Sequence, residues 1–209
     1  MNAQFYIITC VMILTSYLCG GIMFCRLLPK LFCGIEISDV SSDGNPGATN
    51  VFRHCGKKLG IPCVLLDILK GALPVFLCAT YTGYDALLFS LIIIAPVLGH
   101  ATAPFDKGPG GKCISTSFGV LLGLLPYSKI VLILAVIFIL LSTVIKIKDR
   151  RLRSMITFGL FALISVPVLI YEQRFSIMIG CIGISAIASF KHYIMPEKAE
   201  EEIPQEITV

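Results

Sequence analysis

Blocks of apolar residues, separated by short polar segments, run along almost the whole of this 209-residue chain. Most blocks approach the roughly 20 residues that a helix needs to cross the hydrocarbon core of a bilayer. The pattern predicts seven spans, at Phe5–Leu28, Gly60–Tyr81, Asp85–Ala103, Cys113–Leu125, Ser128–Ile147, Ser154–Tyr171 and Phe175–Ile194. The boundary between the fourth and fifth rests on Pro126 and Lys129, which interrupt one long apolar stretch. We therefore expect an all-α, polytopic membrane domain over residues 1–195.

The composition agrees with this pattern. The chain is 56% hydrophobic and 14% charged, and its mean hydropathy is +0.88. In a typical soluble domain, about a quarter of all residues are charged. The first block could instead be a signal peptide, but no cation precedes it and Arg26 lies at its far end. A signal peptide has the opposite charge order, so we expect a retained first helix.

The distribution of cations predicts the orientation. If the N-terminus lies outside, cytoplasmic segments hold all of the 17 Lys and Arg residues except Lys70, Lys129 and Arg174. Cytoplasmic loops of membrane proteins carry such an excess of positive charge. We therefore expect a cytoplasmic C-terminus, where the acidic segment 196–209 forms a solvated and flexible extension.

Two polar, glycine-rich loops interrupt the apolar pattern on the same predicted side. One runs over Asp43–Asn50 and is followed by Arg53, and the other is Gly110–Lys112. Glycine lets backbone N–H groups approach an anion closely, and the cations complete the cradle. The loops thus predict a shared anionic ligand at a membrane surface. Alternatively, Gly110–Lys112 is a simple turn with an interfacial lysine, and Arg53 is a topology anchor.

The fourth span is short enough to place the second loop below the membrane surface. Its 13 helical residues reach about 20 Å, whereas the hydrocarbon core is about 30 Å thick. Irregular backbone at that depth is tolerated where it lines a protein cavity. We therefore expect a recessed polar pocket in which Lys112 stands at a helix N-terminus, an arrangement that favours phosphate.

For the other polar residues and the cysteines, the sequence favours structural roles over catalytic or ligand-binding ones. Asp67 and Lys70, three residues apart on one helix face, predict an ion pair in preference to a catalytic dyad. The nine cysteines include no C-x-x-C pair and lie mostly in apolar runs, so we expect neither a zinc site nor a disulfide framework. The basic segment Lys146–Arg153 lacks interleaved aromatics, which favours a topology determinant near anionic lipid over a nucleic-acid site.

A set of short motifs resembles one family. They are Tyr17-Leu18-Cys19-Gly20, Gly44 to Asn50 with Arg53, Asp67-x-x-Lys70-Gly71, Leu98-Gly99-His100, Gly110-Gly111-Lys112 and Thr116-x-Phe118-Gly119. With this spacing the chain resembles the bacterial acyl-phosphate:glycerol-3-phosphate acyltransferases of the PlsY type. The resemblance implies a seven-span, multi-pass enzyme of the bacterial cytoplasmic (inner) membrane that begins phospholipid synthesis.

The resemblance also implies a reaction and a site. The 1-hydroxyl of glycerol 3-phosphate would attack the carbonyl of an acyl phosphate, giving lysophosphatidate and phosphate, without cofactor, metal or nucleic acid. The long acyl chain would lie among the apolar helices while its phosphate enters the pocket from the bilayer side, and membrane lipid would be a further partner. The expected catalytic residues are His100, His192, Asn45 and Asn50. The expected phosphate-binding residues are Arg53, Lys112, Gly110, Gly111, Ser42 and Thr49. From the residues alone, His100 could orient a substrate or shuttle a proton, but a lone histidine at a helix end is more often a helix cap or a core hydrogen-bonding group.

This chain departs from the family pattern at several positions. Asp43 replaces a serine, which suggests either that Asp43 turns away and Ser42 substitutes, or that the site is impaired. Met195 replaces an asparagine, Pro109 a lysine and Cys113 a glycine. A second hypothesis is therefore a catalytically impaired paralogue that binds phosphate-bearing lipid or regulates an active enzyme. A small-solute transporter is a third, but no inverted repeat of interrupted helices is visible.

Overall fold

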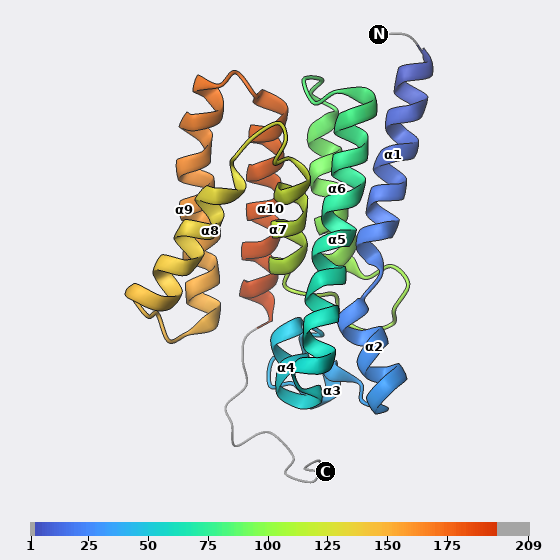
Figure 1. Ribbon diagram of the computed structural model, residues 1–209, viewed down its shortest axis with the longest axis vertical. Coiled ribbons are helices and arrows are strands. Elements are labelled where there is room, and N and C mark those ends of the chain that lie inside the picture. Colours follow the sequence, from blue (N-terminus) through green and yellow to red (C-terminus); the bar gives the residue numbers. More distant parts are fainter. Residues whose placement is uncertain (1–2, 196–209) are drawn as a thin grey trace.

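The protein is a bundle of helices in a computed structural model that describes residues 3–195 (Figure 1). No strand occurs in this part of the chain, which confirms the all-α prediction. The elements are α1 (Ala3–Gly21), α2 (Phe24–Cys33), α3 (Ile37–Val40), α4 (Ala48–Cys55), α5 (Lys57–Thr82), α6 (Phe89–Thr102), α7 (Ile114–Gly123), α8 (Val131–Ile139), the π-helical turn η1 (Leu140–Val144), α9 (Arg150–Tyr171) and α10 (Phe175–Ile194). The acidic extension predicted at 196–209 lies outside the described residues.

Four helical stretches are long and apolar enough to cross a membrane. They are Ala3–Cys33, Lys57–Thr82, Arg150–Tyr171 and Phe175–Ile194. Three shorter apolar helical stretches, Phe89–Thr102, Ile114–Gly123 and Val131–Val144, complete the bundle. These seven correspond in order to the seven apolar blocks of the sequence, and the number of membrane crossings stays a prediction. As expected, the fourth is short, because α7 has only 10 residues.

The first apolar block is not the continuous helix that the sequence predicts. The helix stops at Gly21 and resumes at Phe24, so Ile22 and Met23 lie outside both helices. The Lys70 ammonium donates a hydrogen bond to the carbonyl of Ile22 and lies 5.8 Å from the centre of the Phe24 ring. A cation from another helix thus binds a carbonyl that an unbroken helix would have used.

The same lysine forms the predicted ion pair. Lys70 Nζ lies 2.8 Å from Asp67 Oδ1, and both side chains are almost fully buried. The Cys25 thiol donates to the second oxygen of Asp67 at 3.1 Å. The pair therefore joins α5 to both sides of the break between α1 and α2, which supports a structural role over a catalytic one.

Small residues bring the helices together. A Cβ on Gly20 would lie 2.1 Å from the carbonyl oxygen of Pro96, and one on Gly99 would lie 2.0 Å from that of Tyr17. The α1 and α6 backbones are therefore in direct contact, which is typical of helix packing in membranes. The outer surface is apolar: Leu14, Leu65 and Leu163 have exposed fractions of 57, 58 and 70%.

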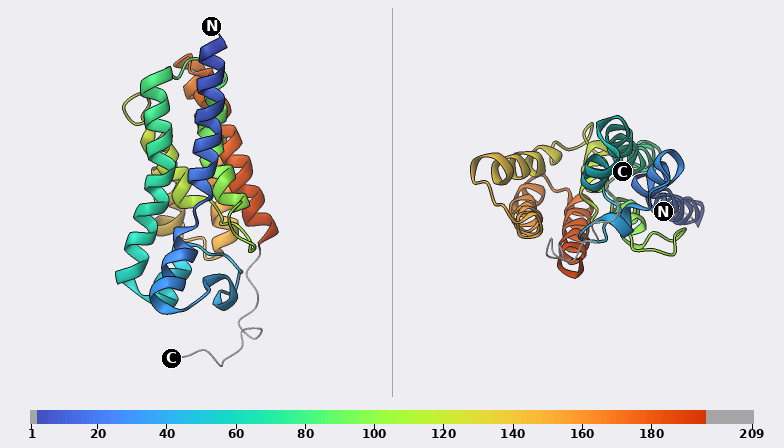
Figure 2. Two further views of the ribbon diagram at one scale, coloured as in Figure 1. Left: turned by 90° about the vertical axis from the view of Figure 1, so that its right-hand side faces the viewer. Right: turned by 90° about the horizontal axis from the view of Figure 1, so that it is seen from below.

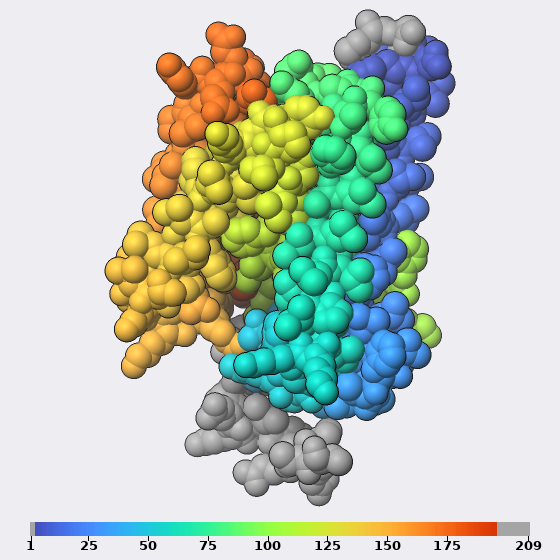
Figure 3. All heavy atoms as spheres, viewed as in Figure 1, coloured from blue at the N-terminus to red at the C-terminus, as the bar shows by residue number. Residues whose placement is uncertain are grey.

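The short helices gather at one end of the molecule. Helices α2, α3 and α4 lie at the end opposite the N-terminus (Figures 1 and 3). The 103–113 loop, the start of α9 and the end of α10 lie towards that same end (Figures 1 and 2). This end brings together the polar segments that the sequence analysis singled out.

Candidate functional site

The two glycine-rich loops meet through an ion pair. Lys112 Nζ lies 2.7 Å from Asp43 Oδ2, although the two residues are 69 positions apart in the chain. Both side chains are nearly buried, with exposed fractions of 7% for Lys112 and 5% for Asp43. Asp43 therefore does not turn away from the site. Its carboxylate binds Lys112, the residue that the sequence analysis expects to bind phosphate.

Two asparagines fix this arrangement. Asn50 Nδ2 donates to Asp43 Oδ1 at 2.9 Å and to the carbonyl of Asn45 at 2.8 Å. The Asn45 N–H donates to Asp43 Oδ1 at 3.2 Å, and Asn45 Oδ1 accepts the N–H of Lys112 at 3.2 Å. Asn45 and Asn50 thus organise both loops.

The Asp43 carboxylate stays ionised in this setting. Burial alone raises the pKa of Asp43, but Lys112, Asn50 and the Asn45 N–H lower it by hydrogen bonding and charge. The net result is a pKa below the ordinary value, so the group is an anion at neutral pH. One ammonium, one amide and one backbone N–H, donors that suit a phosphate, are held by this carboxylate.

His100, near the end of α6, packs against the second loop. The Gly111 N–H donates to the His100 carbonyl at 3.0 Å, and a Cβ on Gly111 would lie 2.1 Å from His100 Nε2. A Cβ on Gly110 would lie 2.1 Å from the carbonyl oxygen of Ala101. Gly110 and Gly111 are therefore required for close approach to the end of α6. The N–H of Gly111 is engaged within the protein and is not presented to a ligand.

A small cavity of about 90 Å³ lies beside the ion pair. It is lined by residues of the first loop and α4, the start of α7, α8, the start of α9 and the end of α10: Asp43, Asn45, Thr49, Asn50, Lys112, Ile114, Phe138, Arg150, Arg151, Arg153, Ser154 and His192. His192 is 3% exposed, and neither ring nitrogen has a hydrogen-bond partner among the described residues. The cavity thus combines several cations with an uncommitted imidazole.

The arginines of α9 are the part of this lining that sequence reasoning missed. The segment Lys146–Arg153 was interpreted as a topology determinant, yet Arg150, Arg151 and Arg153 line the cavity. Arg153 Nη1 donates to the carbonyl of Ile147 at 3.2 Å, and the Arg151 guanidinium lies 5.4 Å from the centre of the Tyr193 ring. The only signal in the sequence was their clustering, which topology explains equally well.

Other predicted site residues lie outside the cavity lining. Arg53 is exposed, one turn beyond Thr49 on the same face of α4. Ser42 is half-buried, and Met195 is buried without lining the cavity. His100 is also absent from the lining. Of the predicted site residues, the cavity lining therefore includes Asn45, Thr49, Asn50, Lys112 and His192. The other predicted residues do not line it: Ser42, Arg53, His100, Gly110 and Gly111.

Metal-binding groups are sparse in the part of the chain that the structure describes. No three His, Cys, Asp or Glu side chains of residues 3–195 gather closely enough to hold a metal ion. The nine cysteines are free thiols.

Comparison with known proteins identifies the family. A family model described as "Glycerol-3-phosphate acyltransferase" matches residues 10–197. Curated proteins of that name include one from Thermotoga petrophila, 36% identical over 177 residues that make up 85% of each chain. Another, from Lactococcus lactis subsp. cremoris, is 34% identical over 89% of this chain and 87% of the relative. The match to a relative from Lawsonia intracellularis is 41% identical but covers only 56% of this chain and 58% of that protein.

Two crystal structures share the fold. Both are of PlsY, an integral membrane glycerol 3-phosphate acyltransferase. The glycerol 3-phosphate form is 28% identical with a TM-score of 0.77, covering 89% of this chain and 88% of that one. The lysophosphatidic acid form is 27% identical with a TM-score of 0.74, covering 88 and 87%. With the family model matched over nearly the whole chain, this protein belongs to the glycerol-3-phosphate acyltransferase family.

Proposed function

We propose that this protein transfers an acyl chain to the 1-hydroxyl of glycerol 3-phosphate at the cytoplasmic side of a bacterial inner membrane. The supporting observation is the cavity beside Asp43, where Lys112 and the arginines of α9 surround a small space that also contains His192. The similarity to PlsY in its glycerol 3-phosphate form supports the same substrate here.

The acyl donor in this proposal is an acyl phosphate. The hydroxyl oxygen of glycerol 3-phosphate bonds to the acyl carbon, the bond from that carbon to the phosphate oxygen breaks, and inorganic phosphate leaves. His192, buried and unpartnered among the described residues, accepts the hydroxyl proton or holds the hydroxyl in place. Because the donor is already activated, the main task of the protein is to align two phosphates and offset their repulsion.

The cations around the cavity perform that task. Lys112, Arg151 and Arg153 supply charge, and Thr49 adds a hydroxyl. Arg53 joins them by reaching back one turn along α4 towards Thr49. Lys112 is already paired with Asp43. The arginines of α9 therefore make more of the contacts to the phosphate than the sequence motifs indicate.

An acyl-transfer assay tests this assignment. Membranes containing the protein are supplied with radiolabelled glycerol 3-phosphate and either acyl phosphate, acyl-CoA or acylated carrier protein. We expect labelled lysophosphatidate with acyl phosphate only. Lys112→Ala and Arg151→Ala should each weaken glycerol 3-phosphate use by about 1.5–3 kcal/mol, the range for a charge-assisted hydrogen bond. Unchanged KM and kcat in a folded variant would remove that residue from the site.

The ion pair between Asp43 and Lys112 favours one alternative, a catalytically impaired paralogue. Such a protein would bind glycerol 3-phosphate or a phosphate-bearing lipid without turning acyl phosphate over. Saturable binding of radiolabelled glycerol 3-phosphate without product formation would establish that alternative and exclude the acyltransferase.

A further inference from the structure

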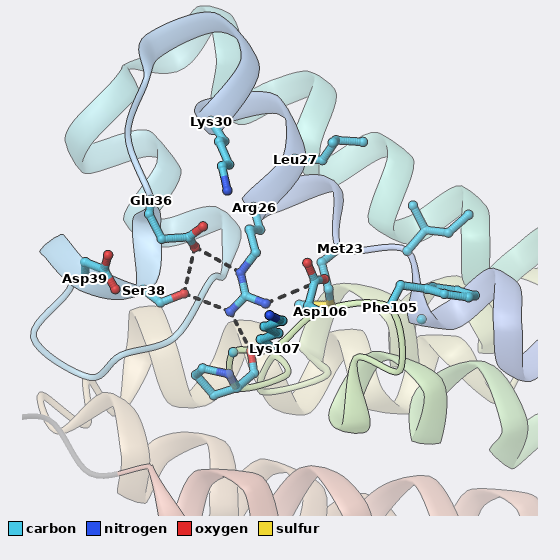
Figure 4. Close-up of a pocket in the computed structure, with 14 residues that line it drawn as sticks. Met23, Arg26, Leu27, Lys30, Glu36, Ser38, Asp39, Phe105, Asp106 and Lys107 are labelled. Carbon is cyan, nitrogen blue, oxygen red and sulfur yellow. Dashed lines mark hydrogen bonds and ion pairs between the residues drawn. The ribbon is translucent and has the colours of Figure 1, made fainter.

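The loop that carries Lys112 borders a second, larger cavity. This cavity of about 930 Å³ is lined by residues around the break between α1 and α2, by the segment before and within α3, and by residues 105–109 (Figure 4). Its apolar lining includes Met23, Leu27 and Phe105. Arg26 lies at its centre, and Figure 4 shows acidic and carbonyl oxygens converging on the guanidinium from both sides.

Arg26 makes three hydrogen bonds and two ion pairs, and only its Nη1 lacks a hydrogen-bond partner among the described residues. Its Nε donates to Glu36 Oε1 at 2.9 Å, and its Nη2 donates to Ser38 Oγ and to the carbonyl of Pro109, each at 2.9 Å. Nη1 forms an ion pair with Asp106 Oδ2 at 3.5 Å. The residue is 6% exposed. The acceptors lie in two separate segments of the chain. A planar guanidinium, with five N–H donors, can reach both segments at once, whereas a compact ammonium cannot.

These contacts join the two segments that build the smaller cavity. Glu36 and Ser38 lie at the start of the segment that leads to Asp43, and Asp106 and Pro109 lie in the loop that ends at Lys112. The loop also fits closely around the guanidinium, because a Cβ on Gly108 would lie 2.6 Å from Arg26 Nη2. Arg26 itself is not part of the lining beside Asp43.

The charges indicate what happens without Arg26. Glu36 and Asp106 approach one guanidinium from opposite segments. Removing the cation leaves two carboxylates facing each other with no shared counter-charge, so the segments should separate. The same acids make the large cavity a poor anion site, because Glu36 and Asp106 already offset the charge of Arg26. Lys30 and Lys107, the other cations of the lining, are exposed.

We propose that Arg26 is a positioning residue of the acyl-transfer reaction: it fastens the 103–112 loop to the 36–47 segment and so holds Lys112 against Asp43 and Asn45. The inference rests on the proposed function for its catalytic consequence. The fastening itself stands on the contacts of Arg26 alone.

The test compares Arg26→Gln and Arg26→Lys in the full-length protein, with Lys30→Gln as the matched control. We expect both Arg26 variants to raise the KM for glycerol 3-phosphate by on the order of tenfold and to change kcat less, as losing a supporting partner of a ligand-binding group does. Lys30→Gln should match the wild type. Asp106→Asn, which removes a partner on the loop side only, is a milder second variant and should shift KM in the same direction.

A second readout does not depend on activity. Native Cys113 directly follows Lys112 and is 1% exposed, and native Cys181 in α10 is 0% exposed. Peptide-resolved maleimide labelling in the native fold should show Cys113 several-fold more reactive in both Arg26 variants, with Cys181 unchanged. This ratio reports release of the loop, whereas general loss of structure would raise both labelling rates equally.

Several outcomes would overturn the proposal. Arg26→Lys behaving as wild type would show that charge alone suffices and that no bridge is needed. An unchanged KM and unchanged Cys113 labelling in Arg26→Gln would show that the loop holds without it. Equal increases at Cys113 and Cys181 would show a purely structural role. If the wild type transfers no acyl group, the proposed function fails, and the Cys113 labelling alone decides whether Arg26 fastens the loop.

Discussion

At the scale of single residues, Asp43 has the most influence on the site. Its carboxylate accepts from Lys112, Asn50 and the Asn45 N–H at once. An incoming phosphate must either displace this carboxylate or bind beside it, and two like charges about 4 Å apart repel by about 4 kcal/mol at intermediate dielectric. Asp43 thus orders the loops, and in the proposed reaction its charge would oppose the phosphate of the substrate.

Replacing Asp43 with Ser separates these two effects. Asp43→Ser frees Lys112 and removes the repulsion, so we expect the KM for glycerol 3-phosphate to fall by on the order of tenfold, about 1.4 kcal/mol. Steady-state kinetics at varied glycerol 3-phosphate measure it, with Asp39→Ser, an exposed acid of α3, as the control. If the wild type turns over well and Asp43→Ser lowers activity, the pocket has been built around the aspartate and is not impaired.

Gly111 offers a steric prediction. In Gly111→Ala, the new methyl group would lie 2.1 Å from His100 Nε2, so the loop must shift. We expect kcat/KM to fall at least tenfold, on the order of 1.4 kcal/mol. Gly159→Ala in α9 is the control, because its Cβ would meet nothing within 4 Å. Equal activities of the two variants would show that the loop has room that the structure does not suggest.

The sequence allowed part of this site to be predicted. Asn45, Asn50 and Lys112 line the cavity and were predictable because they belong to short motifs of fixed spacing, and His192 was predictable from the family resemblance. The arginines of α9 were not predictable as site residues, because their position depends on how α9 packs beside α10. The partners of Arg26 were equally hidden, since Pro109 contributes only a backbone oxygen.

At the scale of elements, the pair of Asp67 and Lys70 contacts the first apolar block at its break. Hydrophobic periodicity located the helices within a few residues, because burial of apolar side chains controls their extent. It did not reveal the break at Ile22 and Met23, whose flanks are apolar on both sides. The lysine that binds the Ile22 carbonyl lies 48 positions away in the chain.

Removing this lysine should destabilise the bundle. Lys70→Met leaves the Asp67 carboxylate buried without a counter-charge, which costs about 3–5 kcal/mol when one partner of a buried pair is lost. Thermal unfolding in detergent measures the effect, with Lys58→Met at the exposed start of α5 as the control. The double variant Asp67→Leu with Lys70→Met should recover much of the loss. A single variant as stable as the wild type would show that the pair contributes nothing.

At the scale of the whole molecule, the polar segments share one end of the bundle. Helix α1 begins at one end, and α10 ends at the other, beside α4 and the 103–113 loop (Figure 1). If all seven apolar helical stretches cross the membrane, as the sequence predicts, the two ends of the bundle would lie on opposite sides. From the excess of cations we then predict that the end that carries the cavity faces the cytoplasm.

Cysteine accessibility in intact cells checks this orientation. In a cysteine-depleted background, a single cysteine is placed at His54, exposed on α4, or at Glu172, in the turn between α9 and α10. An impermeant maleimide should label Glu172→Cys in intact cells, and His54→Cys only after the membrane is opened. The proposed reaction takes glycerol 3-phosphate from the cytoplasm, so the cavity must face that compartment. Labelling of His54→Cys from outside would therefore reverse the topology and remove the proposed site from its substrate, whatever the Lys112 and Arg151 variants show.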